Sequence, residues 1–537
     1  MGRIGVVATV SLLVVSCTNG RSRPTPDQLK PLDRALAAMG GEEKVRALQT
    51  IVVKGTARHW EPHQSVLPDG EMRLAGDSTF VVSRSFSSGA ARIEWDRKLV
   101  YPSPREYRFT EVVTPSAGYV DGIDTTSRTK RDLDSNPPRH SMSGMRLAAA
   151  QRELLRSSPR LILDMKSAPD SLREHTPVNP RGPALDYRVG EVDFTVFFDP
   201  ETGLPARVRT LDADNVEGDS AYDLVLSDWR DVSGVKIAHQ QSYQLNGRQV
   251  VQIKYDEAQV NGSVPSAQLE VPAELRAKAA KPAAGKVPYQ WVIRRQFIGT
   301  YLDSDAVNFD SDAAAGLRLS ELAPGVSQVV GGTHNALVVE MADHLIVFDA
   351  PINEWQSRWT IDAARAKYSG KPIKYLVQTH HHMDHAGGAR TYVAEGAYVL
   401  VGLRNRVHFE NVFTAPHRLD GDLLQQHPRS LPLQLEEIDD RRVLNDGKRT
   451  VEILRVENPH AEGMLIGYLP GNRLGWVADL WSPGRDKLGD KPTPGQAALV
   501  VAVKRLSSTP ERFAGGHGTV ADYAPLAALA EQRQASK

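Results

Sequence analysis

Hydrophobic and polar positions alternate along the first half of the chain, and this pattern predicts a β-rich domain over residues 27–270. A helical pattern over residues 27–47 opens the domain and is interrupted at Gly40-Gly41. From residue 50 onward, β-branched and aromatic residues recur in short runs separated by turn residues, which is typical of strands. The clearest of these runs are 50–55, 80–82, 91–95 and 192–198. Residues 145–156, rich in Ala and Leu, predict a helix among them.

Turns and histidines complete the prediction for this domain. Asn246-Gly247 separates two strand-like runs and predicts a hairpin. The strand layout and residues 198–205 (Phe-Asp-Pro-Glu-Thr-Gly-Leu-Pro) resemble the half-barrels of outer-membrane lipoprotein carrier and sorting proteins. The histidines here are scattered and form no catalytic constellation, so we interpret them as surface or core residues. They are His59, His63, His140, His175 and His239.

The second half of the chain has a different pattern. Residues 273–288 contain almost no large apolar side chain and predict a linker or an exposed helix ending in a tether, within a connecting segment over 271–319. From 320 to 537, strand-like runs and helical patterns alternate, beginning with strands at 326–330, 336–340 and 345–349. This order predicts a second, α/β domain, in which helices pack on a sheet.

Length and charge limit the classes of function. A chain of 537 residues is too long for one ordinary core, which agrees with at least two domains. Its 65 basic and 65 acidic residues balance, so charge gives no reason to expect nucleic acid as a partner. We expect a small-molecule substrate and no nucleic acid, and the sequence leaves the oligomeric state open.

The first residues predict export. Arg3, an apolar stretch over 4–15 and Ser16 before Cys17 describe a signal peptide over residues 1–16, too short for a membrane span. The tetrapeptide at 14–17, Val-Val-Ser-Cys, resembles the bacterial lipobox, and Cys17 is the one cysteine of the chain. We therefore expect a periplasmic cell-envelope protein, anchored to the membrane by a lipid on Cys17. A plain signal peptide and an uncleaved anchor are the alternatives.

The most informative motif follows a strand-like run at 373–379. There the chain reads His380-His381-His382-Met383-Asp384-His385. Side chains two apart point the same way as a strand ends, so His380 and His382 can reach one cation, and Asp384 with His385 a second. A surface histidine loop, or a histidine pair across a helix turn, is the alternative. A zinc helix would need helix-forming residues before the histidines and a Glu as base, and neither is present. The pattern therefore predicts a metal site.

This motif resembles the signature of the metallo-β-lactamase superfamily, whose fold is an αββα sandwich. The resemblance implies three further ligands downstream, which match His460, Asp479 and His517 in strand-end or glycine-rich contexts. It implies a first metal held by His380, His382 and His460, a second held by Asp384, His385 and His517, and Asp479 as the bridge. Two zinc ions are the default for such ligands, with iron or manganese as alternatives.

The resemblance also implies a reaction. Two metal ions would activate a shared water to attack a carbonyl or comparable electrophile, with Asp384 as the catalytic carboxylate that orients it. The expected substrates are a small ester, lactone, thioester, β-lactam or sulfate ester. The thiol-containing β-lactamases place Cys at the position of Asp479 and another group places Ser there. The carboxylate resembles instead the glyoxalase II, lactonase and alkylsulfatase branches.

Two other functions stay open at this point. The chain could be a lipid- or lipoprotein-binding envelope factor whose metal domain is structural or regulatory. Redox chemistry at a di-iron site is a third reading, although the sequence has no glycine-rich flavin or dinucleotide fingerprint.

The remaining histidines of the second domain carry weaker expectations. His334 could line the pocket or belong to a structural turn, and His381 should point away from the metals. The polar insertion at 407–436 is of a kind that often covers the active site in this fold. We interpret its three histidines as surface residues. They are His408, His417 and His427.

Overall fold

The computed structural model describes most of the chain. The described residues are 23–102, 104–124, 137–175, 182–283, 292, 303, 316–332, 334–428 and 433–535. The predicted signal peptide at 1–16 and Cys17 lie outside them, as does most of the predicted connecting segment. Among the described helices, none is both long enough and apolar enough to cross a membrane.

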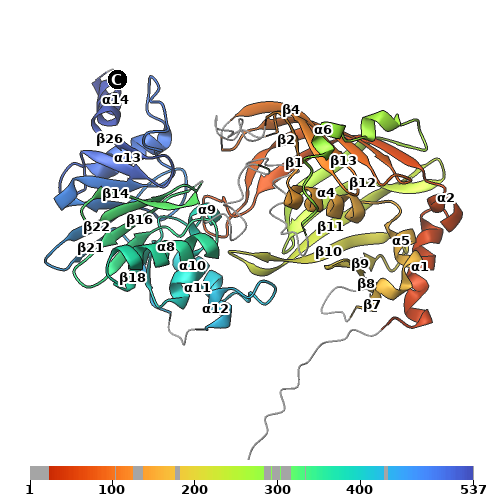
Figure 1. Ribbon diagram of the computed structural model, residues 1–537, viewed down its shortest axis with the longest axis horizontal. Helices are drawn as coiled ribbons and strands as arrows, with labels where there is room; N and C mark the ends of the chain where they lie inside the picture. The colour runs from red at the N-terminus through yellow and green to blue at the C-terminus, as the bar shows by residue number, and fades with distance from the viewer. Residues whose placement is uncertain are drawn as a thin grey trace, which may run out of the picture.

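The N-terminal domain is built on one antiparallel sheet of 13 strands (Figure 1). Helices α1 (Pro26–Ala38) and α2 (Glu42–Arg46) precede it, and the turn at Gly40-Gly41 separates them as predicted. The strands are β1 (Thr50–Glu61), β2 (Arg73–Ser85), β3 (Ala91–Leu99), β4 (Arg105–Val113), β5 (Gly118–Gly122), β6 (Arg139–Ser141), β7 (Leu172–Glu174), β8 (Ala184–Val189), β9 (Val192–Phe198), β10 (Pro205–Asp214), β11 (Gly218–Val232), β12 (Val235–Leu245) and β13 (Arg248–Val260). Their spatial order is 6-5-4-3-2-1-13-12-11-10-9-8-7, so the first strand pairs with the last.

Two helices cover one face of this sheet. Alternate residues of the strands are buried, as in β3, and they pack against α4 (Gly144–Arg156) and α5 (Leu161–Ser167) in one hydrophobic core. A short helix, α6 (Ala273–Arg276), follows the sheet. The predicted β-rich N-terminal domain, its helix at 145–156 and its hairpin at Asn246-Gly247 are confirmed.

The C-terminal domain is a sandwich of two sheets. The first contains β14 (Arg318–Ala323), β15 (Val326–Val330), β16 (Ala336–Glu340), β17 (Leu345–Phe348), β18 (Ile373–Val377), β19 (Tyr398–Gly402) and β20 (Leu435–Ile438), in that order. The second contains β21 (Arg441–Asn445), β22 (Thr450–Val456), β23 (Met464–Leu469), β24 (Leu474–Val477), β25 (Arg512–Gly515) and β26 (Val520–Asp522). A hydrophobic core between the sheets joins residues of both, including Phe348 and Trp476.

Helices lie on the outer faces of both sheets and complete the predicted αββα sandwich. On the first sheet a core joins the strands to α8 (Glu354–Lys367), α10 (Ala389–Ala394) and α11 (Arg406–Thr414). On the second sheet another core includes α13 (Pro494–Val503) and α14 (Ala524–Ala535). The expected fold class is therefore confirmed.

The insertion at 407–436 corrects one prediction. It forms α11 and α12 (Leu423–Gln426), and His427 is exposed as expected. His408 and His417, however, are 5% and 1% exposed and are therefore not surface residues. His408 is buried because its helix packs Phe409 into the core while the imidazole Nδ1 lies 2.8 Å from Asp69 of the N-terminal domain.

The two domains interlock through two hairpin loops of the N-terminal sheet. The turn between β10 and β11 carries Val216, which is buried within the C-terminal core, and Asn215, which donates a hydrogen bond to the Ile352 carbonyl at 2.8 Å. The loop between β1 and β2, residues 62–72, reaches toward α9 (Met383–Ala386) of the C-terminal domain (Figure 1). We call it the β1–β2 loop.

Candidate metal centre

The histidine run lies where a central strand ends. After β18, the Gln378 side chain donates hydrogen bonds to the carbonyls of His380 and His385, at 3.1 and 2.8 Å. The Asp349 carboxylate accepts from the Thr379 amide at 2.9 Å and from its hydroxyl at 2.7 Å. These contacts fix the turn from strand to helix, so the imidazoles that follow are held in a buried, ordered segment.

The first group of candidate ligands comes from both sheets. One ligand atom from each of four residues lies within 4.8 Å of the others, and these residues are His380, His382, His460 and Asp479. His380 and His382 follow β18, whereas His460 lies between β22 and β23. His382 is fully buried. Among the described residues its Nδ1 has no hydrogen-bond partner, whereas its Nε2 lies 2.9 Å from the Ser65 carbonyl. Because a carbonyl only accepts, Nε2 carries the proton and Nδ1 keeps a lone pair for a cation.

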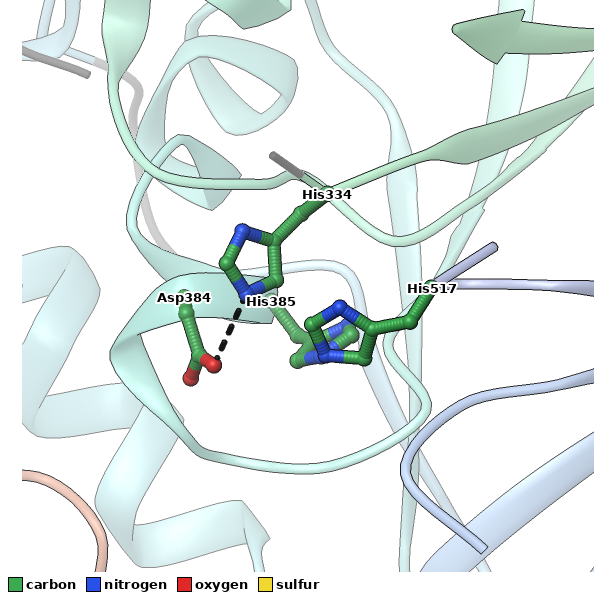
Figure 2. Close-up of side chains that lie close together, drawn as sticks. All are labelled: His334, Asp384, His385 and His517. Atoms are coloured by element: carbon green, nitrogen blue, oxygen red, sulfur yellow. Dashed lines mark hydrogen bonds and ion pairs between the residues drawn. The ribbon is translucent and has the colours of Figure 1, made fainter. Parts of the chain in front are cut away.

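The second group meets the same criterion and consists of His334, Asp384, His385 and His517 (Figure 2). His334 Nε2 lies 3.0 Å from Asp384 Oδ2, and its ring centre lies 4.4 Å from that of His517. His385 is turned by Asp349, whose Oδ2 lies 3.3 Å from its Nδ1. Its other nitrogen therefore faces the site.

Asp479 lies between the two groups. Its Oδ1 is 3.1 Å from His385 Nε2 and 2.8 Å from His517 Nε2. Its Oδ2 is 2.9 Å from His460 Nε2 and 3.4 Å from His380 Nε2. The residue follows β24 with a φ of +28°, a backbone conformation that residues other than glycine rarely adopt. This conformation directs the Asp479 carboxylate between the imidazoles.

Three of the candidate ligands have protonation states that suit cation binding. Burial lowers the pKa of His382 well below its usual value, so this imidazole is neutral. Burial alone would raise the pKa of Asp384, but the hydrogen bond and charge of His334 hold it well below the usual range. The pKa of Asp479 is lowered in the same way by His385, His517 and His460. Neutral imidazoles and ionised carboxylates are the forms that ligate metal ions.

This donor set fits two cations. Seven nitrogen or carboxylate ligands without thiols are typical of zinc, and also accommodate iron or manganese. The structure brings all seven predicted ligands together in two adjacent groups and adds His334 to the second. His381 points away as expected, with Nε2 3.0 Å from the Ser65 carbonyl. That the seven predicted residues and His334 bind metal remains a prediction.

Three residues near the centre were missed from the sequence because they belong to the other domain. Gln64 and Ser65 of the β1–β2 loop contact the histidine motif, and Tyr101 contacts Gln64. A Gln-Ser pair in a polar loop has no periodicity or spacing that links it to ligands more than 300 residues away. Only the meeting of the two domains reveals it.

A comparison with models of protein families identifies a family for the C-terminal domain. The model of the metallo-beta-lactamase superfamily matches residues 329–517. No curated protein matches the sequence. Among solved structures, a metallo-beta-lactamase from Hirschia baltica is similar at 18% identity, covering 40% of this chain and 96% of that one, with a TM-score of 0.31. The mono-zinc form of the metallo-beta-lactamase FIM-1 from Pseudomonas aeruginosa is similar at 19% identity, over 40% and 96%, with a TM-score of 0.30.

The family match spans both groups of candidate ligands, from before His334 to His517. It also spans the strands of both sheets that carry them. Together with these His and Asp groups, it supports a metal-dependent hydrolase. The C-terminal domain of this chain belongs to the metallo-beta-lactamase superfamily.

Proposed function

We propose that the protein is a hydrolase that binds two metal ions, zinc by default, and cleaves a small ester, lactone, thioester, β-lactam or sulfate ester. The position of Asp479 carries the proposal. One of its oxygens faces His385 and His517, and the other faces His380 and His460, which suits a ligand shared by two cations. Iron or manganese could fill the same sites.

Bound metal ions would supply the acidity that lets a water attack at neutral pH and would polarise the oxygen on which charge develops. The chain's own residues do the rest. Asp384 is ionised and 20% exposed at its side chain, so it can accept a hydrogen bond from the attacking water and orient it. Asp349 and Gln378 hold the segment that carries Asp384 in place.

The substrate class rests on the carboxylate at Asp479. A bridging carboxylate resembles the glyoxalase II, lactonase and alkylsulfatase branches more than the β-lactamases with Cys or Ser at this place. We therefore rank esters, lactones, thioesters and sulfate esters above β-lactams.

We also propose that the protein is exported and held at the cell envelope by a lipid on Cys17. The apolar stretch at 4–15 and the lipobox-like residues 14–17 support this. Mass spectrometry of the membrane fraction tests it, since a mature N-terminus other than Cys17, or one without acyl mass, would contradict it.

The described N-terminal domain does not favour lipid binding as a second function. The face of its sheet that α4 covers buries the charged side chains of Arg146, Arg152 and Arg156. A surface depression of about 660 Å³ is lined by polar and charged residues, including Arg58, Asp77 and Lys254. These polar surroundings do not suit an acyl chain, and the apolar pocket between the sheet and its helices, which includes Leu161 and Trp229, measures only about 70 Å³.

Metal analysis combined with ligand variants tests the proposed function. We expect about two metal ions per chain in the purified protein, and loss of metal and of hydrolysis in His382→Ala and Asp479→Asn. The assay panel contains an aryl ester, a lactone, a thioester, a sulfate ester and a β-lactam. His427→Ala is the matched control, because this histidine is exposed and lies outside both ligand groups. A folded wild-type protein with less than one metal ion per chain would refute the proposal.

A further inference from the structure

The β1–β2 loop is anchored to the C-terminal domain at several points. The Glu462 amide donates a hydrogen bond to the Val66 carbonyl at 2.8 Å. Asp69 lies 2.8 Å from the Nδ1 of His408, and Arg73, where β2 begins, donates to the carbonyl of His460. These contacts come from different segments of the C-terminal domain. The loop is therefore held in one position beside the candidate metal ligands.

Two residues of this loop contact the histidine motif directly. The Gln64 amide nitrogen donates a hydrogen bond to Asp384 Oδ1 at 2.7 Å, while Oδ2 of the same carboxylate faces His334. The Ser65 carbonyl accepts from Nε2 of His382 at 2.9 Å. Neither contact uses Oδ2 of Asp384, which faces His334 in the second ligand group, or Nδ1 of His382. The loop thus binds Oδ1 of Asp384 and Nε2 of His382, the atoms that these candidate ligands do not direct toward the other ligands.

Tyr101 holds Gln64 in turn. Its hydroxyl donates to Gln64 Oε1 at 2.7 Å, and the guanidinium of Arg73 lies over its ring, 4.9 Å from the centre. Burial, with the nearby Glu61 carboxylate, raises the pKa of Tyr101 well above its usual value, so the hydroxyl stays protonated. The two hydrogen bonds place the Gln64 nitrogen toward the Asp384 carboxylate and the Gln64 oxygen toward the Tyr101 hydroxyl. The chain Tyr101–Gln64–Asp384 therefore has one consistent direction.

We propose that Gln64, oriented by Tyr101, is a positioning residue for Asp384, so that the N-terminal domain completes the metal centre of the C-terminal domain. The proposal rests on the proposed function, because Asp384 is a ligand only if metal binds. Outer hydrogen-bond partners fix the orientation of ligating side chains, and their loss typically costs about 10- to 100-fold in metal affinity or activity. In this protein that partner comes from a separate domain.

A double-mutant cycle on the full chain tests the proposal. Gln64→Met keeps the length of the side chain and removes the donor to Asp384. Tyr101→Phe removes only the hydroxyl. Gln252→Met is the matched control, because Gln252 is an exposed glutamine on β13 of the same domain. The readouts are the rate at which a chromophoric chelator removes zinc and the visible absorption spectrum of the cobalt(II)-substituted protein, with thermal unfolding to verify folding.

We expect Gln64→Met to release one of two zinc ions about 10-fold faster and to change the cobalt spectrum. Tyr101→Phe should have a smaller effect in the same direction, and no effect when Gln64→Met is already present. If Gln64→Met binds two zinc ions, releases them as slowly as the wild type and has the wild-type cobalt spectrum, this inference alone is overturned. A Tyr101→Phe effect that persists in the double variant would also overturn it. A folded wild type without metal would overturn both this inference and the proposed function.

Discussion

The two domains both bury charged and titratable side chains, but they satisfy them differently. In the N-terminal domain, Arg146 on α4 lies 2.6 Å from Asp124, 2.6 Å from Asp303 and 2.9 Å from Glu111. In the C-terminal domain, nitrogens of four histidines lie between 2.8 and 3.4 Å from the single carboxylate of Asp479. The first arrangement matches opposite charges within the chain. The second surrounds one carboxylate with four imidazoles, which are metal ligands in their neutral form.

This difference separates a structural network from a site. A buried charge is stable when its partners are also in the fold, and Arg146 has them. The buried Nδ1 of His382 has no partner among the described residues. A buried polar atom left in that state normally has an explanation, and a cation is the one that fits the surrounding ligands. The comparison therefore predicts that the C-terminal domain depends on metal and that the Arg146 network does not.

Removal of the metal should have the largest effect. Dialysis against a strong chelator should lower hydrolysis by more than about 100-fold, the upper limit for loss of an outer partner alone, and added zinc should restore it. Hydrogen exchange should become faster around β18 and β24, which precede the ligands. It should stay unchanged in β8 and β9, which lie beyond β10 in the N-terminal sheet and away from the two loops that contact the C-terminal domain. Equal loss of protection in both domains would refute the distinction.

Arg146→Met should have the next largest effect, this time on the N-terminal domain. The variant leaves three buried carboxylates without their cation, which typically costs about 3–5 kcal/mol of unfolding free energy. Denaturant unfolding measures the change. Arg58→Met is the control, because Arg58 pairs with Asp77 on the exposed face of the sheet and its loss should not change stability measurably. A loss as small as that of the control would show that the Arg146 network is not structural.

His59 should give the smallest effect, and it depends on pH. This imidazole is fully buried in β1, and burial, with the nearby charge of Arg97, lowers its pKa to about 3. The unfolded chain binds a proton below about pH 6.5 and the folded chain does not until about pH 3, so stability falls as pH drops through this interval. His59→Gln should remove up to about 1.4 kcal/mol per pH unit of that slope. The measurement is the unfolding free energy of metal-saturated wild type and His59→Gln at pH 6 and pH 4.5. An equal loss of unfolding free energy in the two proteins over this interval would contradict the prediction.

Much of the fold and most of the site could be predicted from the sequence. Alternating strands, the Asn246-Gly247 turn and the helix at 145–156 depend on local patterns, and the structure has all of them. The seven predicted ligands are also found together, because each follows a strand end that the sandwich brings to one edge. These features are encoded over short stretches of chain, which is why they are visible without the structure.

The features that were missed depend on contacts between distant segments. Gln64 has no local signal, and its partner Asp384 lies 320 residues away in the chain. His408 resembles a surface residue of a polar insertion until the β1–β2 loop covers it. His334 could be assigned to the site only when the strand that it precedes was placed beside α9. Burial by another domain is not a property of a segment's own sequence.

The turn that carries Val216 has a consequence for modularity. This side chain is 4% exposed because it is seated among apolar residues of the C-terminal core, and Asp219 beside it binds the Pro416 carbonyl through its amide at 2.7 Å. A truncated protein that begins at residue 316 would expose the apolar residues that Val216 covers, and Pro416 would lose its hydrogen bond from Asp219. The C-terminal domain therefore depends on the N-terminal domain and cannot simply be moved into another protein. A chimaera with a foreign first domain would need to reproduce both hairpin tips to keep the second one soluble and active.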